Sequence, residues 1–298
     1  MESSKAKPSG LECLTACVGD LRAPYEGESF KCCGGHGYGI ARICDGVPEC
    51  LAAARDELRQ GADFLKIMVG GGVASPTDPL EMLQFTAEEI QAITTTARYL
   101  NKYVTAHAYT PEAIRHAIEN GVTSIEHANF IDEDTARLCA EKGVVVTPTM
   151  VIYEALSNPP FDKFLPESGR LKCKQVTESG LEAIRILHQS GVTICYGTDL
   201  LAGMHALQTR EFSVRAKSLP AVEVVRSATT NAAKLLRMDG KLGVISKDAI
   251  ADMLILDKDP LEDVTVLDRM EQTCYGIVKE GRVVMSKISD LAVDVMYR

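Results

Sequence analysis

Several features of membrane, secreted and zinc-ribbon proteins are missing from this sequence. It contains no run of 18 apolar residues, which argues against a transmembrane helix. Residues 1–10 are polar and include no hydrophobic segment of the signal-peptide kind. The ten cysteines are scattered, without a Cys-x-x-Cys pair that would indicate a zinc ribbon or a redox dithiol. We therefore expect a cytoplasmic protein whose thiols are reduced and mostly buried.

Length and charge fit one enzyme domain with a small appendage. The chain has 298 residues, 46% of them apolar, so it can bury a large core. Its 32 basic and 41 acidic residues give a net charge of −9. An acidic balance disfavours a nucleic-acid backbone or an anionic membrane as the main partner. We expect a small-molecule substrate instead.

Four predicted strands each carry a metal-binding or acid–base side chain at or near their ends. The strands lie within 64–68, 104–107, 124–127 and 196–199, and the side chains are those of Lys66, His107, His127 and Asp199. A strand of this kind buries its apolar part in a sheet and presents its last residues at the carboxyl edge, where barrel enzymes build their sites. The order Lys, His, His, Asp predicts a metal-dependent hydrolase.

The predicted helices begin and end with recognisable signals. Thr86 and Glu89 have the spacing of a capping box, and Thr110 is followed by a proline at the first helical position. Four helices stop at glycine, which adopts the left-handed conformation without penalty: Gly61, Gly121, Gly143 and Gly191. Repetition of this helix-to-strand joint predicts successive βα units.

Strands alternating with such helices predict an α/β fold with a parallel sheet. We expect strands near 12–18, 64–69, 103–108, 124–128, 144–150 and 193–199. A (β/α)8 barrel typically takes about 250 residues and needs eight strands. The prediction is a TIM-type barrel over 10–240 that lacks about two strands.

Residues 246–284 differ from the rest of the chain. Segments 251–256 and 276–284 have the pattern of short strands, the second folded around a turn at Glu280-Gly281. They predict a small second sheet. We assign 241–298 to the carboxyl-terminal part of a β-sandwich and a tail.

An ordered set of motifs resembles the amidohydrolase superfamily, in particular its imidazolonepropionase-like and Xaa-Pro or Xaa-Arg dipeptidase branch. The stretches that carry the resemblance are Gly34-Gly-His-Gly37, Gly61-Ala-Asp-Phe-Leu-Lys-Ile-Met68, Gly71-Gly-Val73, Ser75-Pro-Thr-Asp78, Ala106-His-Ala-Tyr-Thr-Pro111, Ser124-Ile-Glu-His127, Gly197-Thr-Asp199, Ala228-Thr-Thr-Asn-Ala-Ala233 and Ala251-Asp252. Each alone is weak, but the ordered set is specific and runs over nearly the whole chain.

The resemblance implies a role for each matching residue. Lys66 matches the lysine that takes up carbon dioxide as a carbamate bridging two metals. His107 and His127 match the histidines of the second metal. Asp199 matches the aspartate that binds the first metal and shuttles protons, and Tyr109 stands where this branch has a tyrosine that touches the substrate. His205 and His36 are further candidates for contact with substrate.

The chemistry of these residues agrees with the implied roles. Neutral imidazole is a good zinc ligand, and carbamylation turns a cationic lysine into an anion that binds metal. A bound metal polarises the scissile carbonyl and lowers the pKa of its water to about 7. Asp199 then accepts a proton and returns it to the leaving nitrogen. The predicted reaction is hydrolysis of an amide, cyclic amide or dipeptide-like C–N bond.

Each candidate residue also has a less specific interpretation. Lys66 is compatible with a surface position or with a Schiff-base nucleophile. Asp199 is compatible with a helix cap, and His36 with a turn residue. His116 and His188 fall within predicted helices, and we treat them as structural.

The sequence departs from the family pattern at its amino-terminal end. The family's first barrel strand ends in His-x-His, which supplies two ligands of the first metal, and no His-x-His occurs here. We therefore expect an amino-terminally truncated member that lacks strands one and two and half of the sandwich. Unpaired strand edges then favour a homo-oligomer. Lys66, His107 and His127 suffice for one divalent metal, expected to be zinc, because a catalytic site needs three protein ligands, whereas the second metal site is incomplete. The alternative is a catalytically silent protein that at most binds a ligand.

Overall fold

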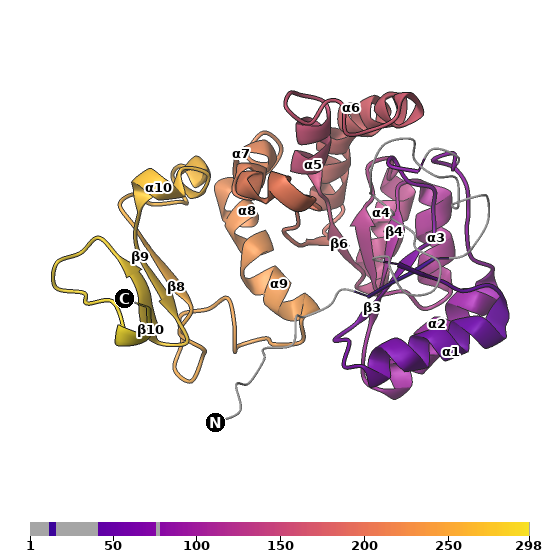
Figure 1. Ribbon diagram of the computed structural model, residues 1–298, viewed down its shortest axis with the longest axis horizontal. Helices are drawn as coiled ribbons and strands as arrows, with labels where there is room; N and C mark the ends of the chain where they lie inside the picture. Colours follow the sequence, from indigo (N-terminus) through magenta and orange to yellow (C-terminus); the bar gives the residue numbers. More distant parts are fainter. Residues whose placement is uncertain (1–11, 16–40, 76–77, 298) are drawn as a thin grey trace.

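The computed structural model describes residues 12–15, 41–75 and 78–297, and its central element is a seven-stranded parallel sheet (Figure 1). The strand order is β2-β1-β3-β4-β5-β6-β7, and every neighbouring pair is parallel. The strands are β1 (Glu12–Thr15), β2 (Ala41–Ile43), β3 (Leu65–Met68), β4 (Val104–Ala108), β5 (Ser124–His127), β6 (Val145–Thr147) and β7 (Thr193–Ile194). The predicted α/β fold with a parallel sheet is confirmed.

Two details of the sheet differ from the sequence prediction. Strand β2 has only three residues, too few to show a hydrophobic pattern, and was not predicted. Strand β7 ends at Ile194 rather than at 199. It ends early because the backbone N–H of Cys195 still bonds to Val146 of β6, whereas that of Tyr196 turns away to the carbonyl of Ser227.

The helices that follow the strands share one hydrophobic core with the outer, apolar face of the sheet. They are α1 (Gly46–Arg59), α2 (Ala87–Tyr99), α3 (Pro111–Glu119), α4 (Glu133–Lys142), α5 (Met150–Leu156) and α6 (Glu167–Gln189). On the outer face Leu65, Ile67, Ala106, Ile125 and Val146 are fully buried in one hydrophobic core with side chains of these helices. Burial of this face fixes which way each strand side chain points, since successive residues alternate.

The opposite face of the sheet is polar. Register pairs Lys66 with Thr105 and His107 with Glu126, and Glu126 in turn with Thr147. These side chains therefore share one face.

The four predicted helix-to-strand joints each contain a glycine with positive φ: Gly61, Gly121, Gly143 and Gly191. At each of them the chain turns from the helix back into the sheet.

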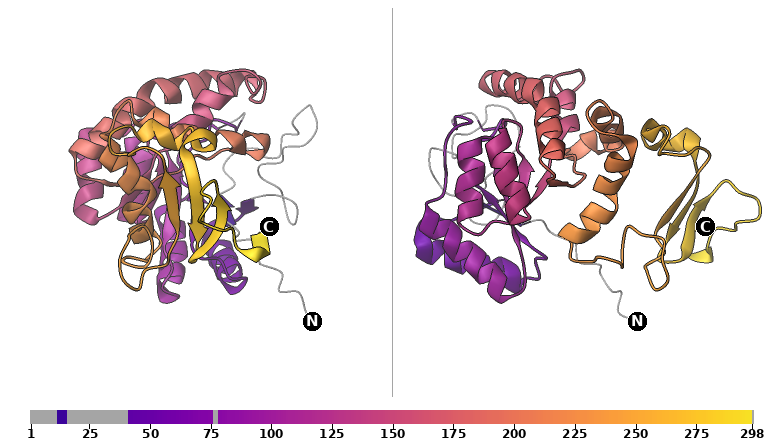
Figure 2. Two further views of the ribbon diagram at one scale, coloured as in Figure 1. Left: turned by 90° about the vertical axis from the view of Figure 1, so that its left-hand side faces the viewer. Right: turned by 180° about the vertical axis from the view of Figure 1, so that it is seen from behind.

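Beyond β7 the chain forms short helices and a second, antiparallel sheet. The helices are η1 (Ala202–Leu207), α7 (Arg210–Arg215), α8 (Ala221–Ala228), α9 (Thr230–Leu235), η2 (Val264–Leu267), α10 (Met270–Thr273) and η3 (Val295–Tyr297). The sheet order is β10-β9-β8, with β8 (Met253–Leu256), β9 (Cys274–Lys279) and β10 (Arg282–Ser286). Helices α7 to α9 lie between the two sheets (Figures 1 and 2). The turn predicted at Glu280-Gly281 joins β9 to β10, and both residues have positive φ.

Two further observations concern the described residues as a group. No helix in 41–75 or 78–297 combines the length and hydrophobicity that a membrane span requires. The six cysteines from Cys44 to Cys274 are free thiols and all are buried.

The predicted capping box is present and gives the first test. Thr86 accepts from the N–H of Glu89 at 3.4 Å, and the Glu89 carboxylate accepts from the N–H of Thr86 at 2.7 Å and of Gly46, at the start of α1, at 2.6 Å. Glu89→Ala leaves two N–H groups without an acceptor, so we expect the free energy of unfolding to fall by roughly 2 kcal/mol. Thr86→Ala should cost about 1 kcal/mol. Urea unfolding measures both, with Glu141→Ala at an exposed position of α4 as the control, expected to change stability by about 0.5 kcal/mol or less.

Candidate metal centre

The side chains of His107 and His127 meet at the carboxyl edge of β4 and β5. Their ring centroids are 4.6 Å apart at an interplanar angle of 70°. Register pairs His127 with Ala108, so strict alternation would point it to the outer face, away from His107. The backbone of His127 instead has φ +77°, and Ala128 has φ +56°. This uncommon left-handed conformation ends the strand and lets the two imidazoles meet.

The imidazole of His107 is neutral and has a defined tautomer. Its Nε2 lies 3.1 Å from the carbonyl oxygen of Gly71, which can only accept, so Nε2 carries the proton. Burial and, to a lesser degree, the charge of Lys66 lower the pKa of His107 from its ordinary 6.5 to about 4. Its Nδ1 therefore presents a lone pair at neutral pH.

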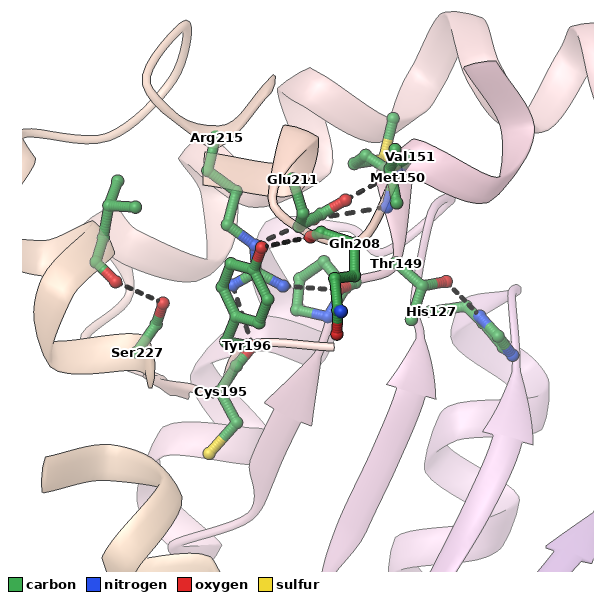
Figure 3. Close-up of polar contacts among 12 residues, drawn as sticks. His127, Thr149, Met150, Val151, Cys195, Tyr196, Gln208, Glu211, Arg215 and Ser227 are labelled. Carbon is green, nitrogen blue, oxygen red and sulfur yellow. Dashed lines mark hydrogen bonds and ion pairs between the residues drawn. The ribbon is translucent and has the colours of Figure 1, made fainter. Parts of the chain in front are cut away.

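The imidazole of His127 is held at its other nitrogen. Its Nδ1 lies 2.7 Å from the hydroxyl of Thr149 and 3.1 Å from that of Tyr153 (Figure 3 shows the Thr149 contact). Tyr153 donates its own proton to Tyr109 at 3.0 Å, so its oxygen accepts from Nδ1–H. Burial, His107 and Lys66 together lower the pKa of His127 well below its usual range. Its Nε2 is left as the nitrogen with a lone pair.

Lys66 lies within electrostatic reach of the histidine pair, and Asp199 lies within reach of Lys66 and Tyr109. Lys66 is half-buried on the polar face of β3, and its charge lowers the pKa of both histidines. Asp199 has φ +53° and keeps an exposed surface. Protein atoms around its carboxyl displace water from the charged form and so raise the pKa of Asp199, and Lys66 partly opposes that rise.

The remaining predicted residues have different outcomes. Tyr109 is buried with its ring 4.8 Å from that of His107 and 5.2 Å from that of His127, so the structure brings it into the site. His205 is exposed on η1, and its described contact is a backbone bond to Gln208. His36 lies outside the described residues.

Sequence reasoning missed three side chains of the site. Glu126 lies on the polar face beside His127 and accepts from Thr105 at 2.6 Å. Glu126 is two residues after Ser124 in the strand, and this spacing could have indicated that both side chains lie on the polar face. Thr149 and Tyr153 belong to the start of α5, where a helical pattern gives no indication that they contact a histidine.

The donor set determines whether a metal ion fits. Metal-binding histidines usually have their second nitrogen held by an oxygen, and both histidines here have that arrangement. Within 41–75 and 78–297, however, no three His, Cys, Asp or Glu side chains gather closely enough to hold a metal. Asp199 therefore does not complete a group with the pair. Lys66, on the polar face of the neighbouring strand β3, would be a third ligand only as a carbamate, because an ammonium group repels a metal ion. Two neutral imidazoles together with such an anion would fit a divalent metal.

The loop after β3 supports His107. Gly71 supplies the carbonyl that orients the imidazole, and Lys172 of α6 donates to the carbonyls of Gly72, Ser75 and Asp78 at 2.7, 2.6 and 2.9 Å. One ammonium thus fixes three points of the loop.

The geometry defines a class: a parallel α/β protein with two buried, neutral histidines at the carboxyl edge of its sheet, where folds of this kind build their active sites. The chain belongs to the amidohydrolase family, which it matches over residues 3–284.

Individual relatives agree with this assignment. The chain is 32% identical to the ochratoxinase of Aspergillus niger over 231 residues, which are 77% of this chain and 48% of that protein. It thus spans about half the length of this curated relative. Among solved structures, a prolidase complexed with N-methylphosphonate-L-proline is 40% identical with a TM-score of 0.85, covering 93% of this chain and 68% of that one. A Xaa-Pro dipeptidase with bound methionine in its active site is 31% identical with a TM-score of 0.78, covering 91% and 66%.

The support of His107 can be tested at Gly71. A Cβ at this position would lie 1.9 Å from the carbonyl oxygen of Pro79, so Gly71→Ala forces the loop to move. We expect a loss of roughly 1–3 kcal/mol of stability, measured by urea unfolding. Gly203→Ala is the matched control because nothing lies within 4 Å of its added Cβ. Equal stability of the two variants would contradict the packing described here.

The low pKa of His107 predicts a pH dependence of the metal-free protein. Between pH 6.5 and 4 His107 is protonated in the unfolded chain but stays neutral in the folded protein. The free energy of unfolding therefore falls as the pH is lowered through this range. The shift corresponds to roughly 3 kcal/mol. Urea unfolding with a chelator present, from pH 7 to 4, measures this slope. His107→Gln should reduce it, whereas His188→Gln, at an exposed position of α6, should leave it unchanged.

Proposed function

We propose that this protein is a metal-dependent amidohydrolase that cleaves a C–N bond in small, dipeptide-like substrates. The observation that carries the proposal is the buried pair of neutral imidazoles, each anchored by an oxygen at its outer nitrogen. That arrangement prepares Nδ1 of His107 and Nε2 of His127 to share one ion. Family membership supports the same reaction class.

Lys66 supplies the third ligand in this proposal. Its uncharged amine adds to carbon dioxide and releases one proton, which gives an anionic carbamate on the polar face of β3. A divalent ion, proposed to be zinc, supplies Lewis-acid chemistry by polarising the substrate carbonyl and making water acidic enough to attack near pH 7. The neutral state of both histidines is required for this ligand set, and their lowered pKa values secure it.

Asp199 and Tyr109 handle the substrate and its protons. The raised pKa of the Asp199 carboxyl suits a group that takes a proton from water and returns it to the leaving nitrogen. Tyr109 keeps its phenol protonated because burial raises its pKa, so it can donate to the substrate carbonyl. We also propose Asp199 as a ligand of a further metal, and His205 and His36 as contacts of the substrate.

The substrate class is taken from the relatives. A prolidase and a Xaa-Pro dipeptidase both have solved structures similar to this chain, and ochratoxinase is a curated relative. We therefore propose Xaa-Pro dipeptides first and other N-acyl amino acids second. We also assign the chemistry to 10–240, regard its sheet as part of a TIM-type barrel, and treat 241–298 as the carboxyl-terminal part of a β-sandwich and a tail. We further propose that the protein forms a homo-oligomer.

Metal content per chain is the decisive measurement. Protein purified with bicarbonate and zinc should hold about one metal, as a three-ligand site allows, by plasma mass spectrometry. His107→Ala/His127→Ala should abolish both this metal and the hydrolysis of Xaa-Pro dipeptides. His188→Ala, exposed on α6, should retain both. If the wild-type protein holds no more metal than the double variant, the proposal is contradicted, and the chain is a catalytically silent member of the family.

A further inference from the structure

A fully buried ion pair lies next to the candidate site. Glu211 and Arg215 stand one turn apart on α7, both with side chains 0% exposed, and Arg215 Nε donates to Glu211 Oε1 at 2.8 Å (Figure 3). Burying two charges is costly, and replacement by apolar residues is often neutral or stabilising. The other groups that the two side chains bind therefore have to explain why a buried ion pair is present here.

The pair holds the backbone on both sides of Thr149. Glu211 accepts from the N–H groups of Met150 and Val151 at 3.3 and 2.7 Å. Arg215 donates to the carbonyl of Pro148. The residue before Thr149 and the two after it are thus fixed by one ion pair, while the Thr149 hydroxyl lies 2.7 Å from Nδ1 of His127.

The same guanidinium holds the chain that leaves β7. Arg215 donates to the carbonyl of Cys195 at 2.8 Å and stacks 5.1 Å above the ring of Tyr196. The hydroxyl of Tyr196 donates to the carbonyl of Gln208 at 2.6 Å. Three residues later the chain reaches Asp199 with its left-handed backbone.

We propose that Glu211 and Arg215 are positioning residues of the candidate site. They fix Thr149 against His127 and the segment that leads to Asp199, so that the strand ends of β6 and β7 keep a constant relation to the imidazole pair. Neither residue touches the candidate metal ligands. The inference rests on the proposed function for its catalytic meaning, but its structural content can be measured without metal.

The orientation of His127 provides a readout that loss of stability alone would not change. With ¹⁵N-labelled histidine, long-range ¹H–¹⁵N spectra of the metal-free protein should show a single Nδ1–H tautomer of His127. Arg215→Lys keeps the charge but cannot reproduce the planar fork that reaches three oxygen acceptors. We expect this variant to fold and to show a mixture of His127 tautomers. Because the Tyr153 hydroxyl also accepts from Nδ1–H, Thr149→Val should have the same effect in a Tyr153→Phe background, where Thr149 is the remaining partner. Thr149→Ser in that background should keep the wild-type spectrum.

Zinc affinity, measured by competition with a chromophoric chelator, gives the second readout. Arg215→Lys and Thr149→Val should each weaken binding about 10- to 100-fold, the usual effect of losing an outer-shell partner. The double variant should be no weaker than either single one, because both act through the same hydroxyl. Arg185→Lys, in the exposed pair with Glu182, is the matched control and should leave affinity and spectrum unchanged.

Two results would overturn the inference. One is a folded Arg215→Lys variant with wild-type His127 resonances, and the other is additive losses of zinc affinity in the double variant. A wild-type protein that binds no zinc would instead contradict the proposed function, and the metal-free spectra would then decide the positioning role alone.

Discussion

Two imidazoles 4.6 Å apart in a buried space favour the state in which neither is charged, and much of the structure serves that constraint. Protonation of either ring would place an uncompensated charge beside the other and beside Lys66. The surroundings prevent it by burial, and they direct the one proton of each ring outward to an oxygen. The other nitrogen of each ring, Nδ1 of His107 and Nε2 of His127, keeps its lone pair.

Support reaches the two histidines by separate routes. His107 depends on the loop after β3, which Lys172 ties to α6. His127 depends on Thr149 at the start of α5, which the Glu211–Arg215 pair ties to α7 and to the end of β7. Strand alternation alone would leave the two rings on opposite faces of the sheet. Contacts from helices later in the chain therefore help to hold the rings together.

The sequence allowed the framework to be predicted because its signals are local. Glycine at the helix ends, the capping box at Thr86 and polar residues at the strand ends each need only a few neighbouring residues. Contacts across about 60 residues, such as that of Glu211 with Val151, leave no such pattern. The turn of His127 toward His107 was also unreadable, since alternation predicts the outer face and histidine has no marked preference for positive φ comparable to that of glycine. The three-residue strand β2 was too short to be detected.

The left-handed backbone at His127 also limits how this site can evolve. Branched and bulky side chains are strongly disfavoured at φ +77°, whereas asparagine, aspartate and glycine are tolerated. A lineage that loses this imidazole without rebuilding the strand end would therefore exchange nitrogen for oxygen or for no ligand. Oxygen donors suit harder ions such as magnesium, calcium or manganese. The backbone angle at one residue thus channels the metal preferences that descendants of this protein can acquire.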